Sequence, residues 1–355
     1  MNLYENPLYR EDVRLVASLC LPWEKLHNTT LLVSGISGLI GSFLWDVLAQ
    51  KNREEGLNCT VYGLCRHLRE AEERFGGSPG RDFLHLLPQD VCEPLMGIEG
   101  RVDYVLHLAS NTHPLQYATD PIGTITTNFL GLKNLLDFAV THGAARFLFA
   151  SSNEIYGQNR GDTEAFDEDY CGYINPNTLR AGYPESKRCG EALCQAYAAQ
   201  KGLDFVIPRF TRTYGPTMRL SDSKALSQFI RKGIHGEDIV LKSDGMQYYS
   251  YTYAADAVSG LLTVLLRGKA GEAYNIAHTG GDIRLREAAA LVAKCSGRKV
   301  VFESPDALEA AGYSTATVAR LDGTKLQQLG WNPRYSIQAG ISRTLSILSA
   351  VYPTP

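Results

Sequence analysis

A tyrosine, a lysine and a serine carry the chemistry that this sequence suggests first. Tyr183 and Lys187 stand four residues apart, so they lie one turn apart on one face if the run 185–200 is helical. An ammonium beside a phenol favours the ionised phenol, which can then act as a base. Ser152 follows the apolar run 146–150, which has the composition of a buried strand. Together these residues predict a site that takes a proton from a sugar hydroxyl, or returns it, with Tyr183 as the base.

A Tyr-x-x-x-Lys pair is weak evidence alone, because such pairs also occur on solvated helix surfaces. A glycine-rich turn strengthens the interpretation: the apolar run 30–34 is followed by Gly35, Gly38 and Gly41 and then by an apolar-periodic helix. Such a turn lets the backbone approach a pyrophosphate, and the helix N-terminus supplies unpaired N–H groups. We therefore expect a dinucleotide here, bound through Gly35, Ser37, Gly38, Leu39, Ile40 and Gly41.

The residue after the second predicted strand bears on the choice of cofactor. The run 59–65 ends at Arg66, and none of the residues 64–66 is acidic. An acid there would bind the ribose hydroxyls of NAD, whereas an arginine suits the 2′-phosphate of NADP. Alternatively, Arg66 only stacks on the adenine. The sequence favours NADP over NAD, and further contacts to a tightly bound cofactor are expected from Asp90, Val91, Leu108, Ala109, Ser110, Asn128, Ala150, Ser151, Tyr183, Lys187 and Phe210.

The elements that position these residues alternate between strand and helix. This alternation predicts an α/β fold with a doubly wound parallel sheet of the Rossmann type and a smaller C-terminal lobe that binds substrate. We expect an N-terminal extension over 1–28, the NAD(P)-binding domain over 29–215, and the substrate-binding lobe over 216–249 and 276–355. The segment 250–275 is expected to return to the first domain.

Composition excludes several classes of function. The 355 residues carry a formal net charge of −3, which gives no electrostatic reason to expect nucleic acid or a membrane as partner. No apolar run reaches the roughly 18 residues that span a bilayer, and the N-terminus lacks the apolar core of a secretory signal. The eight cysteines are scattered without metal-ligand spacing, so we expect reduced thiols in a cytoplasmic protein that holds no metal.

The chain resembles the extended short-chain dehydrogenase/reductases, specifically their NAD(P)-dependent nucleotide-sugar epimerase/dehydratase group, from about residue 31 to about residue 348. The matching residues are Gly35, Gly38, Gly41, His107, Leu108, Ala109, Asp120, Pro121, Asn128, Gly131, Ser151, Ser152, Glu154, Tyr156, Gly157, Tyr183, Lys187, Tyr214, Gly215, Pro216, Asp244, Gly245, Asp256, Ala257, Tyr274, Asn275, Ile276, Leu329, Gly330, Trp331 and Pro333.

The resemblance implies roles for the three residues named first. Tyr183 would be the base for the sugar 4-hydroxyl, Ser152 would bind the same oxygen, and Lys187 would bind the nicotinamide ribose and tune Tyr183. Hydride transfer from C4 would give a 4-keto sugar. The family members then differ: the hydride returns after rotation (epimerases), water is lost across C5–C6 (dehydratases), or a C6 carboxylate is lost (decarboxylases).

Glu154 and Asn153 bear on that outcome. Once C4 is a ketone the C5 proton is acidic, and Glu154 could remove it. By resemblance, 4,6-dehydratases and UDP-glucuronate decarboxylases carry a carboxylate there. Asn153 stands where some dehydratases have an Asp that protonates the leaving hydroxyl. We favour a 4,6-dehydratase, with a UDP-glucuronate-type decarboxylase or a 4-epimerase as alternatives, and a net reductase or a non-catalytic NAD(P)-sensing scaffold as further ones. Glu154 could also serve only as an acceptor at the strand end.

Two departures from the family concern its substrate, a nucleoside-diphosphate sugar. Tyr249 stands where members usually carry an Arg that grips the diphosphate, and Arg212 lies close to a usual Asn. An arginine fork suits phosphate, so we expect Arg212, together with Arg219, to replace the missing guanidinium. The expected substrate-binding residues are Thr211, Arg212, Arg219 and Tyr249. By resemblance the protein is a homodimer that pairs through the helices after Pro121 and Tyr183.

Overall fold

The computed structural model describes residues 2–112, 114–305, 310, 313, 314 and 316–353. An eight-stranded sheet forms its centre, and all of the strand pairs in it are parallel. The strand order is β11-β7-β5-β4-β1-β2-β3, with the short β6 paired to β7. These strands are β1 (Thr30–Ser34), β2 (Thr60–Cys65), β3 (Leu84–Pro88), β4 (Tyr104–His107), β5 (Arg146–Phe149), β6 (Ser151–Ser152), β7 (Phe205–Phe210) and β11 (Glu272–Ile276).

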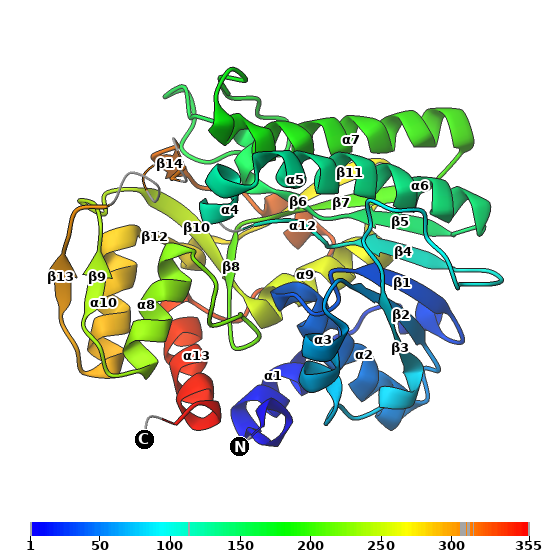
Figure 1. Ribbon diagram of the computed structural model, residues 1–355, viewed down its shortest axis with the longest axis horizontal. Coiled ribbons are helices and arrows are strands. Elements are labelled where there is room, and N and C mark those ends of the chain that lie inside the picture. The colour runs from blue at the N-terminus through cyan, green and yellow to red at the C-terminus, as the bar shows by residue number, and fades with distance from the viewer. Residues whose placement is uncertain (1, 113, 306–309, 311–312, 315, 354–355) are drawn as a thin grey trace.

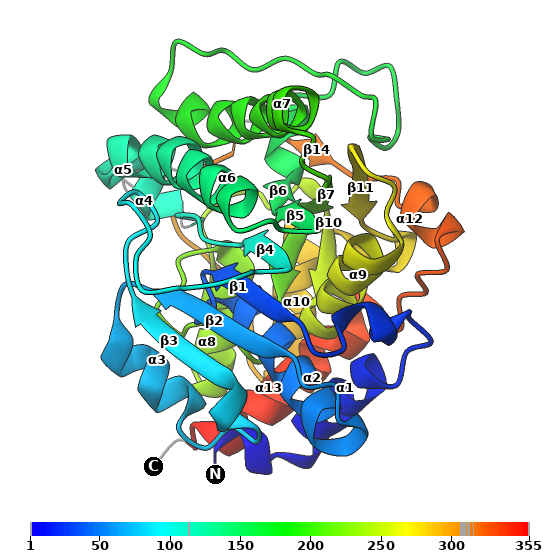
Figure 2. The same cartoon turned by 90° about the vertical axis from the view of Figure 1, so that its right-hand side faces the viewer.

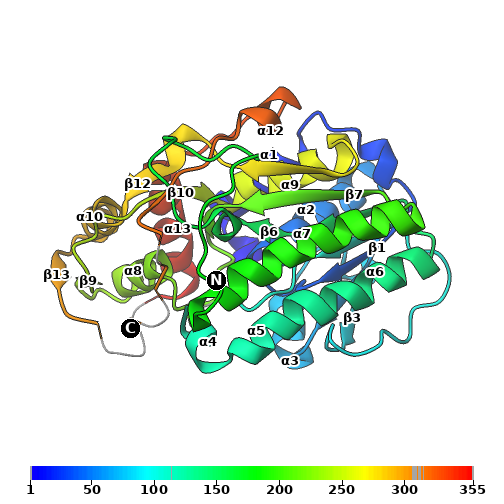
Figure 3. The same ribbon diagram turned by 90° about the horizontal axis from the view of Figure 1, so that it is seen from above.

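Helices cover both faces of this sheet, which confirms the doubly wound α/β fold (Figures 1 and 2). Because both faces are covered, the central strands are apolar on both sides; all four residues of β4 are buried. One face carries α5 (Pro121–Thr126), α6 (Leu132–Thr141) and α7 (Gly182–Lys201), which lie side by side in Figure 3. The other face carries α2 (Leu39–Glu55) and α9 (Ala254–Arg267). The shorter helices α3 (Leu68–Phe75) and α4 (Pro114–Thr119) follow β2 and β4.

The helix expected after Asp120 is interrupted. A π-helical turn, η4 (Thr127–Gly131), separates α5 from α6. It contains Asn128, which is fully buried, and a π turn shifts the helix register so that this amide faces inward. The interruption therefore has an identifiable polar residue at its centre.

A second lobe is built around a small sheet. Its strands are β8 (Arg212–Tyr214), β10 (Tyr248–Tyr253), β12 (Asp282–Arg284) and β14 (Val318–Ala319). A separate parallel pair consists of β9 (Ile239–Leu241) and β13 (Val300–Phe302). Three helices pack on one another beside them: α8 (Ala225–Ile234), α10 (Leu285–Ser296) and α13 (Ile337–Val351). The short α12 (Thr324–Gln328) packs on β11.

The N-terminal helix α1 (Pro7–Ala17) lies against elements from distant parts of the chain. It packs on α2, α9 and α13. At its centre Asp12 is fully buried and accepts hydrogen bonds from the hydroxyls of Tyr253 and Tyr335, each at 2.6 Å. The guanidinium of Arg343 on α13 also pairs with Asp12, at 2.6 Å. The expected N-terminal extension is thus a helix that joins the chain's two ends.

Candidate active site

The predicted site residues converge on one cavity of about 910 Å³ where the parallel strands end. All of them line it except Asn128. The cavity extends from the glycine-rich turn, past the ends of β4 and β6, to α8 and β10 of the second lobe. This position matches the general location of ligand sites in open parallel sheets.

The glycine-rich turn is packed too closely for side chains. A Cβ at Gly35 would lie 2.8 Å from the backbone nitrogen of Ala109, and one at Gly41 would lie 2.4 Å from the carbonyl oxygen of Gly35. Gly35 also has φ of +70°, which favours glycine. The turn leads into α2 with Gly38 as its N-cap, and all three glycines line the cavity. The residues present therefore fit a dinucleotide whose pyrophosphate lies at the start of α2.

The cationic residues near the adenosine end are Arg66 and Arg219. Arg66 is exposed at the end of β2 and lines the cavity. Arg219 was expected at the sugar nucleotide, but it lies beside the glycine-rich turn, with its guanidinium 3.3 Å from the Ser37 hydroxyl and 3.5 Å from the Glu70 carboxylate. Its place in the fold is therefore at the cofactor side of the cavity.

Tyr183 and Lys187 occupy one face of α7, as the spacing predicted. The Lys187 ammonium donates to the carbonyl of Ala150 at 2.8 Å and lies 5.9 Å from the centre of the Tyr183 ring. Burial raises the pKa of Tyr183 to about 12, although hydrogen bonds with Ser152 and Ser110 and the nearby Arg180 oppose that rise. Burial lowers the pKa of Lys187 to about 7. Two cations therefore lie near the phenol: Lys187, to which the sequence pattern pointed, and Arg180.

Ser152 holds its position through a helix cap. Its hydroxyl oxygen accepts from the backbone N–H of Glu154 at 3.2 Å, and so caps the 3-10 turn η5 (Asn153–Tyr156). The same hydroxyl lies near Tyr183 and lowers the pKa of that phenol. The cap therefore fixes the side chain that the resemblance assigns to the sugar oxygen, and it places Asn153 and Glu154 next to it.

Glu154 has a partner that the sequence analysis missed. Its carboxylate is 2.8 Å from the guanidinium of Arg180, and both side chains are largely buried, 19% and 11% exposed. Arg180 also stacks over the ring of Tyr117 at 4.6 Å, and Tyr117 stacks on Tyr183 with ring centres 4.9 Å apart. The only sequence signal for Arg180 is its place three residues before Tyr183, in the turn η6 (Leu179–Ala181).

Arg180 keeps unused hydrogen-bond donors inside the site. Among the residues that the structure describes, no partner hydrogen-bonds its buried Nε and Nη1 atoms or the buried Nη1 of Arg212. Both arginines line the cavity near Glu154. A buried donor without an acceptor is costly, so two guanidinium groups with free donors indicate a place where an anionic or acceptor-rich group of a ligand binds.

Asn128 lies behind the cavity and outside its lining, contrary to the expected cofactor contact. Its oxygen accepts from the Ser110 hydroxyl at 2.8 Å, and its Nδ2 donates to the Ser186 hydroxyl at 2.9 Å. Asn128 lies in the π turn and is buried, so its polar side chain requires hydrogen-bond partners. It orients Ser110, which lines the cavity and hydrogen-bonds Tyr183.

Arg212 covers the residue that replaces the usual arginine. Its guanidinium lies 3.4 Å from the centre of the Tyr249 ring, and the Tyr249 hydroxyl donates to the carbonyl of Ala316 at 2.8 Å. A tyrosine tied down in this way is a platform for the flat guanidinium. Thr211 is buried beside them and shares a hydrogen bond of 2.6 Å with Thr252.

We expect the Arg212→Ala protein to bind UDP-sugars about tenfold more weakly, the size of one lost charge-assisted hydrogen bond. Cofactor affinity should stay the same, because Arg212 is on the sugar side of the cavity. Calorimetric titration with UDP-glucuronate and with the cofactor measures both. Arg219→Ala is the matched control: its loss should appear in cofactor affinity instead. An unaltered sugar-nucleotide titration in Arg212→Ala contradicts the assignment.

Other features of the described residues concern metals and membranes. All eight cysteines are free thiols, and four of them are exposed. Among these residues, no group of three or more His, Cys, Asp or Glu side chains has the arrangement of a metal site. Within the same part of the chain, no helix combines the length and the apolar character that crossing a membrane requires.

A Rossmann-type domain with a serine, a tyrosine and a lysine at the strand ends defines an extended short-chain dehydrogenase/reductase. The chain belongs to the NAD dependent epimerase/dehydratase family, whose sequence model matches residues 31–277. The resemblance stated from the motifs is thereby confirmed.

Individual relatives narrow the comparison. The chain is 32% identical to UDP-glucuronic acid decarboxylase 5 of Arabidopsis thaliana over 319 residues, which are 88% of this chain and 87% of that protein. It is 30% identical to UDP-glucuronic acid decarboxylase 1 of Danio rerio, over 90% of this chain and 72% of that protein. DesIV, a dTDP-glucose 4,6-dehydratase of Streptomyces venezuelae solved with NAD and TYD bound, superposes with a TM-score of 0.76 at 25% identity, over 91% of this chain and 97% of that one.

Proposed function

We propose that this protein oxidises C4 of a nucleoside-diphosphate sugar transiently, and that its outcome is loss of a C6 carboxylate. The Ser152, Tyr183 and Lys187 arrangement supports the oxidation step. The observation that carries the choice of outcome is Arg180, a largely buried guanidinium beside Glu154 with two donors free. A uronic acid carboxylate supplies the anion that these donors lack. Two decarboxylases among the relatives support the same choice.

The first step removes the proton of the 4-hydroxyl. Tyr183 accepts it with the Ser152 hydroxyl beside it, and Arg180 favours the negative charge of the phenol oxygen. A nicotinamide cofactor held by the glycine-rich turn and Lys187 would supply the acceptor for the C4 hydride and the donor for its return. Because Tyr183 is buried, the proton that it takes stays in the site and is available to the same oxygen in the reverse transfer.

The second step breaks the C5–C6 bond. With C4 a ketone, the C6 carboxylate is β to a carbonyl, so its loss as carbon dioxide leaves the electron pair as an enolate across C4 and C5. The protonated Tyr183 and Ser152 donate hydrogen bonds to that enolate oxygen. C5 then takes a proton that water supplies and that the Glu154 carboxylate can relay. Return of the hydride to C4 and of the Tyr183 proton to the C4 oxygen would complete the reaction.

Dehydration, the outcome favoured from the sequence, is the second candidate. Glu154 supports it, because a carboxylate held at the site can remove the C5 proton. Asn153 opposes it, because an amide cannot protonate a leaving hydroxyl as a carboxylic acid does. Epimerisation at C4 needs neither residue, so it does not account for the paired Glu154 and Arg180.

The deciding experiment is incubation of the purified protein with UDP-, dTDP-, GDP- and CDP-sugars, UDP-glucuronate included, followed by mass spectrometry. We expect a product lighter by one carbon dioxide from the uronate. Loss of water identifies a dehydratase, and an isomer of unchanged mass identifies an epimerase by NMR. Unaltered sugars across the panel, together with tight cofactor binding, point to the non-catalytic scaffold.

Two further parts of the proposal concern cofactor and assembly. Arg66 and the absence of an acid at the end of β2 support acceptance of NADP as well as NAD, the cofactor bound in DesIV. A homodimer through α5 and α7 is supported by large apolar side chains exposed along α5 and η4, next to α7. These side chains are Ile122, Ile125, Phe129 and Leu130.

A further inference from the structure

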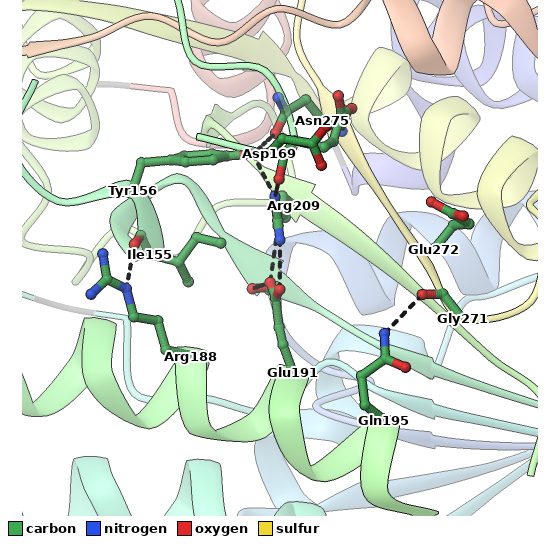
Figure 4. Close-up of polar contacts among 12 residues, drawn as sticks. Ile155, Tyr156, Asp169, Arg188, Glu191, Gln195, Arg209, Gly271, Glu272 and Asn275 are labelled. Carbon is green, nitrogen blue, oxygen red and sulfur yellow. Dashed lines mark hydrogen bonds and ion pairs between the residues drawn. The ribbon is translucent and has the colours of Figure 1, made fainter. Parts of the chain in front are cut away.

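Figure 4 shows a largely buried ion pair between Arg209 and Glu191. Arg209 is the sheet partner of Ser151, next to Ser152, and neither member of the pair lines the cavity. The guanidinium of Arg209 on β7 grips both carboxylate oxygens of Glu191 on α7, at 3.0 and 2.7 Å. Two of its other donors bind the Tyr156 hydroxyl at 2.8 Å and the carbonyl of Glu168 at 2.6 Å. Four of the five N–H donors of Arg209 are therefore engaged, and Glu191 is held in a fixed orientation.

Glu191 is joined to the active-site segment by a short hydrogen bond. The hydroxyl of Ser151 donates to its Oε1 at 2.5 Å. The residue before Ser151 is Ala150, whose carbonyl accepts from the Lys187 ammonium at 2.8 Å. Glu191 and Lys187 are one turn apart on α7. Two side chains from one helix face thus hold two consecutive residues of the strand end.

The charges around Lys187 are few. Burial lowers the pKa of Lys187 to about 7, and Glu191 on the same helix opposes that shift. Cys194 is also near, but burial raises the pKa of its thiol, which therefore stays neutral. The other titratable or charged groups that face it are Tyr183 on α7, the fully buried His107 on β4 and, behind Glu191, Arg209 on β7. Among the described residues, no carboxylate other than Glu191 supports this buried cation.

His107 adds no positive charge there. The Ser34 hydroxyl oxygen accepts from the backbone N–H groups of Leu108 and Ala109, so its own proton points to Nδ1 of His107 at 2.8 Å. Burial, with Lys187 adding to its effect, holds the pKa of His107 well below its ordinary value. The His107 ring is neutral, so Glu191 is the neighbouring charged group that favours the ammonium form of Lys187.

We propose that Glu191 is a positioning residue for Lys187: anchored by Arg209, it fixes the Ala150–Ser152 segment against α7 and supplies the negative charge that keeps the buried Lys187 an ammonium. The mechanistic meaning of this role rests on the proposed function, because the family resemblance gives Lys187 its role toward the cofactor and Tyr183 in that reaction. The charge effect itself does not, and it can be measured without substrate.

The test is Glu191→Gln, which keeps the shape and the acceptor for Ser151 but removes the charge. Removal of a nearby negative charge destabilises the ammonium, so the titration midpoint of Lys187 should move to lower pH by about one unit. Carbon NMR of protein labelled at the lysine ε-carbon records it, with the signal assigned by its absence in Lys187→Arg. Glu185→Gln on the same helix is the matched control, and its Lys187 midpoint should not move.

The activity profile gives a second measurement once a substrate is known. In Glu191→Gln the pH above which kcat falls should move down by the same amount as the NMR midpoint. A lowered melting temperature with an unmoved Lys187 midpoint shows that Glu191 is merely structural and overturns the proposal. If the midpoint moves while no sugar is turned over by the native protein, the proposed function fails and the electrostatic role stands.

Should Glu191→Gln fail to fold, Ser151→Ala tests the link from the strand side, because it deletes only the hydroxyl that joins Glu191 to the segment. We expect kcat to fall about tenfold with KM little changed, since the substrate side of the strand end keeps its groups. Unchanged kcat, with an unmoved Lys187 midpoint, contradicts the proposal as well.

Discussion

Tyr183→Phe should lower kcat on the accepted nucleotide sugar by about a thousandfold, the range of a lost general base. The phenol oxygen receives the 4-hydroxyl proton. The neighbouring hydroxyls of Ser152 and Ser110 are not basic enough to replace it. The Phe ring keeps the stack with Tyr117, so folding and cofactor affinity should be retained.

Single-turnover formation of the product, followed by mass spectrometry, measures this loss. Tyr117→Phe is the control, since it removes a hydroxyl from the neighbouring ring and preserves the stacking of both. Its rate should stay within a few-fold of the native one. In the native protein the rate should increase with pH, because more of Tyr183, whose pKa is about 12, ionises. The increase should end near the Lys187 pKa of about 7, where the ammonium is lost. A Tyr183→Phe protein that retains activity would place the base elsewhere.

Arg180→Gln should reduce kcat/KM for a nucleotide uronate on the order of a hundredfold, as expected when one partner of a buried charge pair is truncated. Two effects combine: the substrate carboxylate loses its guanidinium, and Glu154 is left as an uncompensated anion 19% exposed. Most of the loss should appear in KM. A neutral sugar nucleotide such as UDP-glucose, used as a competitive ligand, should bind the variant as it binds the native protein.

Glu154→Gln separates the two members of this pair. It leaves Arg180 free for the substrate, so the affinity for the uronate should be kept or improved. Turnover should fall, because no carboxylate remains to relay the proton to C5. A 4-keto sugar should accumulate, detectable by mass spectrometry after quenching. Equal losses of affinity for neutral and uronate sugars in Arg180→Gln would show that Arg180 does not distinguish them, and would return weight to dehydration.

The parts of the site that depend on local spacing were predictable. Gly35, Gly38 and Gly41 form a turn whose strand and helix are next to it in the chain, and Tyr183 and Lys187 share one helix face. Their geometry follows from backbone conformation alone. The parallel sheet was predictable for the same reason, because each of its alternating strands and helices has a hydrophobic pattern that can be recognised locally.

The remainder depends on contacts between distant segments. A role for Arg180 is visible only because the turn η6 brings it to Glu154. A role for Glu191 is visible only because β7 places Arg209 against it. Arg219 was expected at the sugar nucleotide and lies beside Ser37 of the glycine-rich turn, because a charge on a loop carries no signal of its direction. Asn128 was expected at the cofactor, but a π turn, which no periodicity revealed, directs it to Ser110 and Ser186.

The helix that joins the two ends of the chain has a consequence for how the protein is made. Asp12 and Arg343 are 331 positions apart, so α1 leaves the ribosome long before Arg343, which neutralises Asp12, has been synthesised. Until then α1 carries a carboxylate destined for full burial and an apolar stripe of Tyr9, Val13 and Val16. Closure of so distant a contact is slow compared with local folding. The segment that contains α1 is therefore synthesised long before α13 and is among the last to dock, and the nascent chain must keep it soluble while the rest of the fold assembles.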